Sequence, residues 1–90
     1  MEVTNVRLKL KGDERIKATC SITLDNVFVV HDIKVVNGQN GLHVAMPATK
    51  FRNGEYHDIA HPITNDVREM INTAVMNEYN LQLQNNPVQV

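Results

Sequence analysis

The fold is decided by residues 16–24, which read IKATCSITL, and by the turn that follows them. Apolar and polar side chains alternate strictly here, and a period of two residues is typical of a β-strand with one buried face. Asp25-Asn26 comes next, and both residue types tolerate the left-handed φ values of a tight two-residue turn. The alternation predicts that the core-facing side chains are Ile16, Ala18, Cys20, Ile22 and Leu24.

Three neighbouring stretches also show strand patterns. Residues 6–10 (VRLKL) alternate in the same way, and residues 12–15 supply a polar turn after them. Residues 27–36 form a third strand that opens with the apolar run VFVV, and such a run is expected to be central and covered on both faces. Residues 42–46 predict a fourth strand, which Pro47 ends.

After Pro47 the sequence predicts a small hairpin. Asn53-Gly54 favours a type I′ turn. That turn would join Lys50-Phe51-Arg52 to residues 56–59. Pro62 then breaks the chain before the last element.

The last element is expected to be an amphipathic helix. Asp66, with Glu69 three residues later, predicts a capping box at its start. Apolar residues follow at helical spacing as a single stripe, namely Val67, Met70, Ile71, Ala74, Val75 and Tyr79. The expected architecture is therefore α+β, an antiparallel β-meander of about four to six strands followed by one C-terminal helix.

Length and composition narrow the class of protein. Ninety residues make one domain, expected over residues 1–83, with residues 84–90 as a polar disordered tail. Cys20 is the only cysteine, which excludes an intrachain disulfide and fits a reducing cytoplasm. Charges interrupt residues 1–17, and no apolar run approaches the ~20 residues that span a bilayer. We expect a cytoplasmic protein without membrane insertion.

Candidate catalytic and metal-binding groups are few. Four histidines lie between His31 and His61, and His is a zinc ligand, but four residues of strand would separate His57 from His61 by about 13 Å. Imidazoles hydrogen-bonded in loops and at strand ends are the favoured interpretation, so no metal and no other cofactor is expected. Neighbours on a strand point to opposite faces, so His31 and Asp32 should form no dyad. Cys20, on an apolar face, is expected to be an inert thiol.

Positive charge is concentrated in two places despite a net charge of −1. The first place is the polar face of the first two strands, which holds five of the nine Lys and Arg residues, namely Arg7, Lys9, Lys11, Arg15 and Lys17. An ordinary solvated sheet face is the alternative interpretation. The balanced net charge argues against binding nucleic acid by bulk charge alone, so any such binding requires a local patch.

The second basic feature is Lys50-Phe51-Arg52 in the predicted hairpin. Two cations beside an aromatic ring can contact phosphates while the ring stacks on a base. The alternative is that Phe51 packs inward. The predicted helix has Arg68 as its one cation among several carboxylates, which makes it a poor reader of a DNA groove. The candidate nucleic-acid contacts are Lys50, Phe51, Arg52, Arg7, Lys9 and Lys17.

Several longer runs occur here in the order found in one known family. The most specific are SITLD (21–25), FVVHDI (28–33), VAMP (44–47) and DIAHPI (58–63). On these runs the sequence resembles the stage V sporulation protein G (SpoVG) family of bacterial septation proteins, over about residues 1–79. The resemblance implies a homodimer with a β-sheet and C-terminal helices. It also implies a non-enzymatic role in sporulation and division septum formation, and binding to DNA and RNA as a regulator.

One segment departs from the family pattern. After Pro47 the family usually has a basic Ser-Lys-Arg-Thr-Pro-type segment that ends in Asp-Gly-Glu, whereas residues 48–55 here read ATKFRNGE. Lys50 approximately matches a basic position, and Arg52 stands where the family often has a turn residue. Two hypotheses follow: a dimeric nucleic-acid-binding regulator, or a protein-interaction module of the septation machinery that does not bind nucleic acid.

Overall fold

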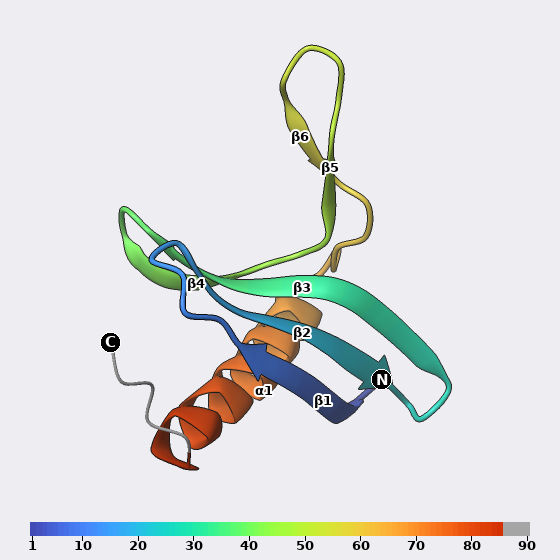
Figure 1. Cartoon of the computed structure of the whole chain (residues 1–90). Helices are drawn as coiled ribbons and strands as arrows, with labels where there is room; N and C mark the ends of the chain where they lie inside the picture. The colour runs from blue at the N-terminus through green and yellow to red at the C-terminus, as the bar shows by residue number, and fades with distance from the viewer. Residues whose placement is uncertain (86–90) are drawn as a thin grey trace.

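A computed structural model describes residues 1–85 as one four-stranded sheet, one two-stranded hairpin and one helix (Figure 1). Strands β1 (Val3–Leu10), β2 (Ile16–Leu24), β3 (Phe28–Gly38) and β4 (Gly41–Ala45) pair antiparallel in chain order. Strands β5 (Ala48–Lys50) and β6 (Tyr56–Asp58) form the hairpin, which stands away from the sheet in Figure 1. The predicted α+β meander with a C-terminal helix is confirmed.

Helix α1 (Asn65–Asn85) lies along one face of the sheet (Figure 1). It includes Gln84 and Asn85, which the sequence assigned to a disordered tail, and the rest of that tail lies outside the described residues. Thr64 caps the helix, because its Oγ1 accepts a hydrogen bond from the Val67 amide at 3.3 Å. The predicted capping box of Asp66 and Glu69 is wrong, since Asp66 already lies inside the first turn.

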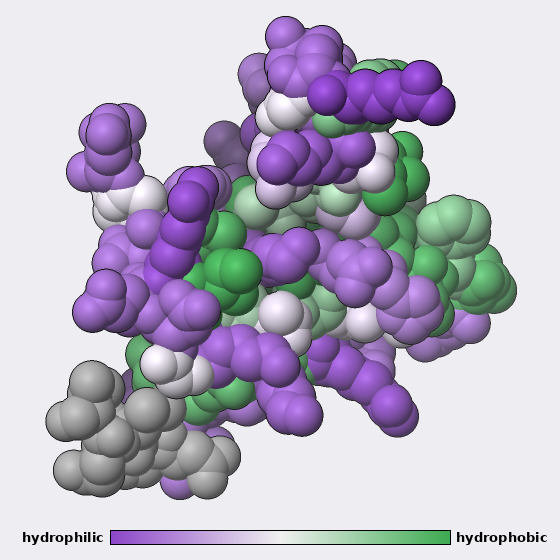
Figure 2. Space-filling model, turned by 45° about the horizontal axis from the view of Figure 1, so that its top comes forward, coloured by the Kyte–Doolittle hydropathy of each residue, from purple (hydrophilic) through white to green (hydrophobic). Residues whose placement is uncertain are grey.

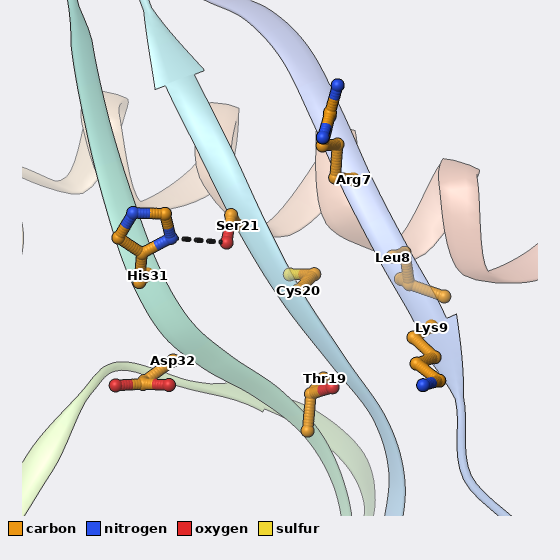
Figure 3. Close-up of a pocket in the computed structure, with 8 residues that line it drawn as sticks. All are labelled: Arg7, Leu8, Lys9, Thr19, Cys20, Ser21, His31 and Asp32. Carbon is orange, nitrogen blue, oxygen red and sulfur yellow. Dashed lines mark hydrogen bonds between the residues drawn. The ribbon is translucent and has the colours of Figure 1, made fainter.

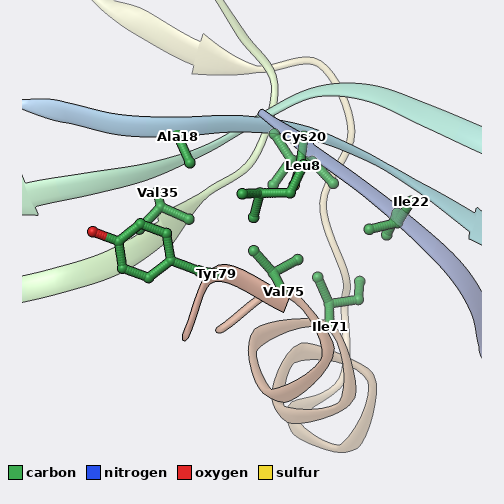
Figure 4. Packing of buried hydrophobic residues seen from close by; sticks show 9 residues of the cluster. Leu8, Ala18, Cys20, Ile22, Val35, Ile71, Val75 and Tyr79 are labelled. Atoms are coloured by element: carbon green, nitrogen blue, oxygen red, sulfur yellow. The ribbon is translucent and has the colours of Figure 1, made fainter. Parts of the chain in front are cut away.

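The core lies between α1 and the sheet (Figure 4). Ile71, Val75 and Tyr79 of the predicted stripe meet the inward side chains of the first three strands, namely Leu8, Ala18, Cys20, Ile22, Ile33 and Val35. Each fully buried valine or isoleucine stabilises the fold by about 1.5–3 kcal/mol. Near the end of the helix, Gln82 Nε2 donates to the Leu8 carbonyl at 2.8 Å and ties α1 to β1.

The β2–β3 turn has the predicted geometry. Asp25 and Asn26 have φ values of 50° and 58°, and the Val27 amide donates to the Leu24 carbonyl at 3.0 Å. The Asn26 amide donates to Thr4 Oγ1 at 2.9 Å, so the turn is also held by β1. The Asp25-Asn26 prediction is confirmed.

One inward prediction fails at the start of β2. Ile16 pairs with Val36 and Ala18 pairs with Val35, so β2 holds an extra residue between these pairs. Such a β-bulge reverses the side-chain alternation. Ile16 therefore lies beside Val36 on the face turned away from α1, which we call the outer face, and the expectation that it points into the core is wrong.

The apolar start of β3 is not covered as expected. Val27, Phe28 and Val29 are 84%, 62% and 47% exposed. The reason is that β4 pairs only with residues 34–38 of β3, so within the described chain residues 28–30 have β2 as their one strand neighbour. Figure 2 shows apolar surface at the end of the molecule where the β2–β3 turn lies. Within β3 only Ile33 and Val35 are buried, and both lie in the core on the helix side, so the expectation of cover on both faces is wrong.

Candidate nucleic-acid interface

The outer face carries a basic row that crosses three strands. Lys9 pairs with Thr19, and Thr19 pairs with Lys34. Lys34 points outward because its neighbours Ile33 and Val35 are both fully buried on the helix side. Lys34 thereby joins the predicted Lys9, although it is not among the contact residues predicted from the sequence.

A shallow hollow of about 580 Å³ lies next to this row, and we call it the strand hollow (Figure 3). Arg7 and Lys9 of β1 flank it, while Thr19, Ser21 and His31 lie across its width. Ser21 Oγ and His31 Nδ1 are hydrogen-bonded at 2.8 Å. The two predicted cations Arg7 and Lys9 thus stand beside hydroxyl and imidazole groups that can also contact a phosphate oxygen.

Asp32 lines the same hollow as His31, contrary to the prediction that the two point apart. Cys20 pairs with Ile33 and Ile22 pairs with Val30, which leaves both His31 and Asp32 opposite Ser21. This second bulge gives Asp32 a left-handed φ of 64° and removes the strict alternation.

The Ser21–His31 pair lacks the third group of a catalytic triad. A serine nucleophile needs a base that a further residue orients, and within residues 1–85 no hydrogen bond joins the Asp32 carboxylate to His31. In the same range no three His, Cys, Asp or Glu side chains gather closely enough to hold a metal ion. His61 Nδ1 instead contacts the Pro62 carbonyl at 3.0 Å, as expected for a backbone-bonded imidazole.

The β5–β6 hairpin forms where predicted, but with another turn. The Gly54 amide donates to the Phe51 carbonyl at 3.0 Å, and the Phe51 amide donates to the Glu55 carbonyl at 2.8 Å. Gly54 has a φ of 87°, while Asn53 is not left-handed. The loop is therefore the three residues Arg52-Asn53-Gly54, and the predicted type I′ turn is wrong because it needs positive φ on both Asn53 and Gly54.

This geometry separates residues that are adjacent in the predicted contact segment. Lys50 pairs with Tyr56, so their side chains share one face of the hairpin. The Phe51 ring lies on the other face against His57, with 4.1 Å between ring centroids. Arg52 occupies the exposed loop. Phe51 is itself 51% exposed, so the alternative that it packs inward does not hold.

A second hollow of about 450 Å³, the hairpin-base hollow, lies between the root of the hairpin and the outer face. Ile16 and Val36 contribute apolar surface to it. Its polar side chains come from the β1–β2 turn and from three strands, namely Arg15, Lys34, His43 and Tyr56. The structure therefore brings the two basic features together, since the predicted Arg15 and the hairpin face that bears Lys50 border one hollow.

Of the remaining predicted cations, Lys11 and Lys17 lie at the β1–β2 end of the sheet. The Lys11 amide donates to the Lys17 carbonyl at 2.8 Å, and Lys17 is half-buried whereas Lys11 is exposed. Lys17 stands next to the β2 bulge. It lines neither of the two hollows.

The cations are free of carboxylate partners in the described part of the chain. The one ion pair within 4 Å among residues 1–85 joins His57 Nε2 to Glu55 Oε2 at 3.3 Å. Of the nine Lys and Arg residues, all except Arg68 lie outside α1. The helix instead holds three carboxylates, Asp66, Glu69 and Glu78. The other seven of the ten Asp and Glu residues lie outside α1, as do the eight remaining cations, so the helix is acidic and the rest of the chain carries both signs of charge.

Cys20 is buried as predicted, with 5% of its surface exposed. Burial in the core disfavours the thiolate and raises the pKa of the Cys20 thiol to about 11. Since the thiolate is the reactive form, this cysteine is a packing residue rather than a nucleophile.

Within residues 1–85, α1 is not apolar enough over its length to cross a bilayer.

These observations define a small α+β protein with a helix-backed meander, a basic outer face and a projecting hairpin. Comparison with known proteins then gives the family: the SpoVG family model matches residues 1–81, and the chain belongs to the SpoVG family. The expectation drawn from the sequence runs is confirmed.

Curated relatives agree with the family model. The chain is 52% identical over 87 residues to "Putative septation protein SpoVG" of Caldanaerobacter subterraneus subsp. tengcongensis, covering 96% of each chain. It is 54% identical over 80 residues to the protein of that name from Thermoanaerobacter sp., covering 88% of this chain and 87% of the relative. For the Finegoldia magna protein of that name, identity is 53% over 81 residues, with 89% and 75% covered.

Proposed function

We propose that the protein is a non-enzymatic, dimeric regulator of sporulation and septum formation that acts in the cytoplasm by binding nucleic acid. The septation role is supported by the names of its relatives. The binding role rests chiefly on one observation: eight of the nine Lys and Arg side chains lie away from the helix, and none described has a carboxylate within 4 Å.

The proposed contact surface runs over the outer face and onto the hairpin. Arg7 and Lys9 flank the strand hollow, and Lys34 continues their row toward the hairpin-base hollow. Lys50 and Arg52 extend positive charge onto the hairpin. Lys17 lies at the end of the sheet and lines neither hollow. Cations without a carboxylate partner are available to neutralise phosphates, and the counterions of the phosphate backbone are released on contact.

The nucleic-acid role is tested by fluorescence anisotropy over a salt series with labelled DNA and RNA. We expect affinity to fall steeply with salt, by about 0.9 units of log–log slope per phosphate neutralised on a duplex and about 0.7 on a single strand. The Lys50→Ala/Arg52→Ala variant should bind more weakly and with a shallower slope. No detectable binding of any oligonucleotide at low salt would contradict this function, and an unaltered slope in the variant would remove the hairpin from the site.

Dimerisation is proposed because apolar surface and a strand edge coincide. Val27, Phe28 and Val29 are largely exposed, and residues 28–30 have one free edge within the described chain. A second chain that covers this end would remove apolar surface from water and pair the open edge. Light scattering at micromolar concentration should give about twice the 10.2 kDa chain mass.

The variant that tests the proposed dimer contact is Phe28→Glu. A carboxylate in an apolar interface costs several kcal/mol, so this variant should shift toward the mass of a single chain. Val27→Glu is the companion at the most exposed position of the run, 84% exposed. A wild-type protein that scatters as a single chain would contradict the dimer. A Phe28→Glu variant that stays dimeric would place the contact elsewhere.

A protein-interaction role without nucleic acid is the second candidate. It is favoured by a hollow on the helix side that combines Glu2, Asp66 and Glu69 with the apolar Met70 and Ala74. Such a surface suits a basic amphipathic segment of a partner. Recovery of division proteins after nuclease treatment, together with absent oligonucleotide binding, would select this role.

A further inference from the structure

We infer that the hairpin-base hollow takes an unpaired nucleotide, with its base stacked on the Tyr56 ring, so that the preferred ligand is single-stranded nucleic acid. This inference rests on the proposed function and specifies which form of nucleic acid the outer face binds. The hollow's volume of about 450 Å³ lies within the ~300–1,000 Å³ of pockets that hold small ligands.

Tyr56 presents a free aromatic face at the hollow. It lines the hollow and is 70% exposed, more than any other Tyr or Phe in the described chain. The other exposed aromatic of the hairpin, Phe51, already lies against His57 on the opposite side. Every base has a π-face that can stack on such a ring, whatever the sequence.

The floor beneath Tyr56 is apolar. Ile16 reaches it only because the β2 bulge turns its side chain away from the core, and its pair Val36 lies beside it on β3. A flat, apolar base can cover these branched side chains and exclude water from them. Neither Ile16 nor Tyr56 contributes to the core. A stacked base in the hollow would explain both the outward Ile16 and the exposed Tyr56.

Charge around the hollow fits the sugar–phosphate chain of that nucleotide. Arg15 and Lys34 line the hollow, and Lys50 stands beside Tyr56 on the same hairpin face. Asp58 is the one carboxylate of that face, since it pairs with Ala48. Three cations against one anion leave a net positive rim around the apolar floor. A positive groove combined with an aromatic ring is typical of proteins that bind single strands.

A duplex does not fit this arrangement. Its bases are stacked and paired, so Tyr56 cannot reach a base face without unstacking the helix at a cost of a few kcal/mol. A duplex can still contact the cations of the outer face through its phosphates. The structure therefore predicts that Tyr56 contributes to single-strand binding and not to duplex binding.

The test uses dye-labelled oligo(U), oligo(dT) and the oligo(dT)·oligo(dA) duplex, each of about 12 nucleotides, within the site sizes known for stacking platforms. The wild-type chain is compared with Tyr56→Leu, which keeps an apolar side chain, and with Tyr56→Phe, which keeps the ring. Tyr56→Leu should weaken single-strand binding by at least about fivefold, Tyr56→Phe should stay within about twofold, and duplex affinity should not change. The oligo(U) and oligo(dT) arms distinguish RNA from DNA.

The outcomes separate this inference from the proposed function. If the wild type binds none of the three probes, the proposed function itself fails. If it binds them with a steep salt slope while Tyr56→Leu matches the wild type on both single strands, the stacking site is wrong and the basic surface stands. A loss in Phe51→Ala with none in Tyr56→Leu would likewise overturn the site.

Discussion

Val75→Asp is expected to abolish the folded state. Val75 is fully buried at the middle of the α1 stripe, between Ile71 and Tyr79 and against the sheet (Figure 4). A buried carboxylate without a partner costs several kcal/mol, and the lost valine packing adds to this. A chain of this size has about 5–13 kcal/mol of stability in total. Far-UV circular dichroism and urea titration should show little or no cooperative transition.

Asn72→Asp is the matched control for this experiment. Asn72 is exposed on the same helix, so the substitution adds the same charge without burying it, and its effect should stay within about 0.5 kcal/mol. If Val75→Asp instead unfolded cooperatively near the wild-type midpoint, α1 would not cover the sheet in solution. The core shown in Figure 4 would then be wrong, because Ile71, Val75 and Tyr79 on its helix side all come from α1.

The parts of the fold that follow local rules could be predicted from the sequence. The Asp25-Asn26 turn depends on two residues that tolerate left-handed φ, and it forms with both of them there. The α1 stripe depends on a spacing that holds whatever the helix covers, and Ile71, Val75 and Tyr79 are all buried. Membership of the SpoVG family could also be predicted, because runs such as SITLD and DIAHPI are contiguous in the chain and can be recognised without the three-dimensional structure.

The predictions for Ile16 and Asp32 were wrong because the directions of these side chains depend on how the strands pair. Nothing in the run around Ile16 marks the extra residue that turns it outward, because the bulge is defined only against Val36 on β3. The second bulge likewise placed Asp32 beside His31 in one hollow. Local turn chemistry also misled in one place, where Asn53-Gly54 suits two loop lengths and the chain adopts the longer one.

The candidate site was predictable in composition but not in arrangement. Arg15 and Lys50 were visible as cations, yet their approach to one hollow requires the root of the hairpin to border the outer face. Alternation alone could have marked Lys34, whose neighbours Ile33 and Val35 are apolar. Tyr56 had no such signal, since only the three-dimensional structure shows the apolar floor beside it.

Removal of positive charge from the hairpin-base hollow is expected to have the largest effect on binding. The triple variant Arg15→Gln/Lys34→Gln/Lys50→Gln neutralises the three cations that line or border it. Three fewer phosphate contacts should make the salt slope shallower by about 2.1 units on a single strand. Between 1 M and 0.15 M salt, that slope corresponds to about a 50-fold loss of affinity at the lower concentration. Anisotropy titrations across this range measure both quantities.

Net charge alone could produce a smaller loss, so the decisive control moves the same charge change to the helix. Asn72→Asp/Asn77→Asp/Asn80→Asp also lowers the net charge by three, at exposed positions of α1. Screening at 0.15 M salt acts over about 8 Å, and α1 lies behind the sheet, so affinity should change by less than about threefold. Equal losses in both variants would mean that overall charge, not the outer face, governs binding. A large loss in the first variant alone places the phosphates where the sheet and the hairpin meet.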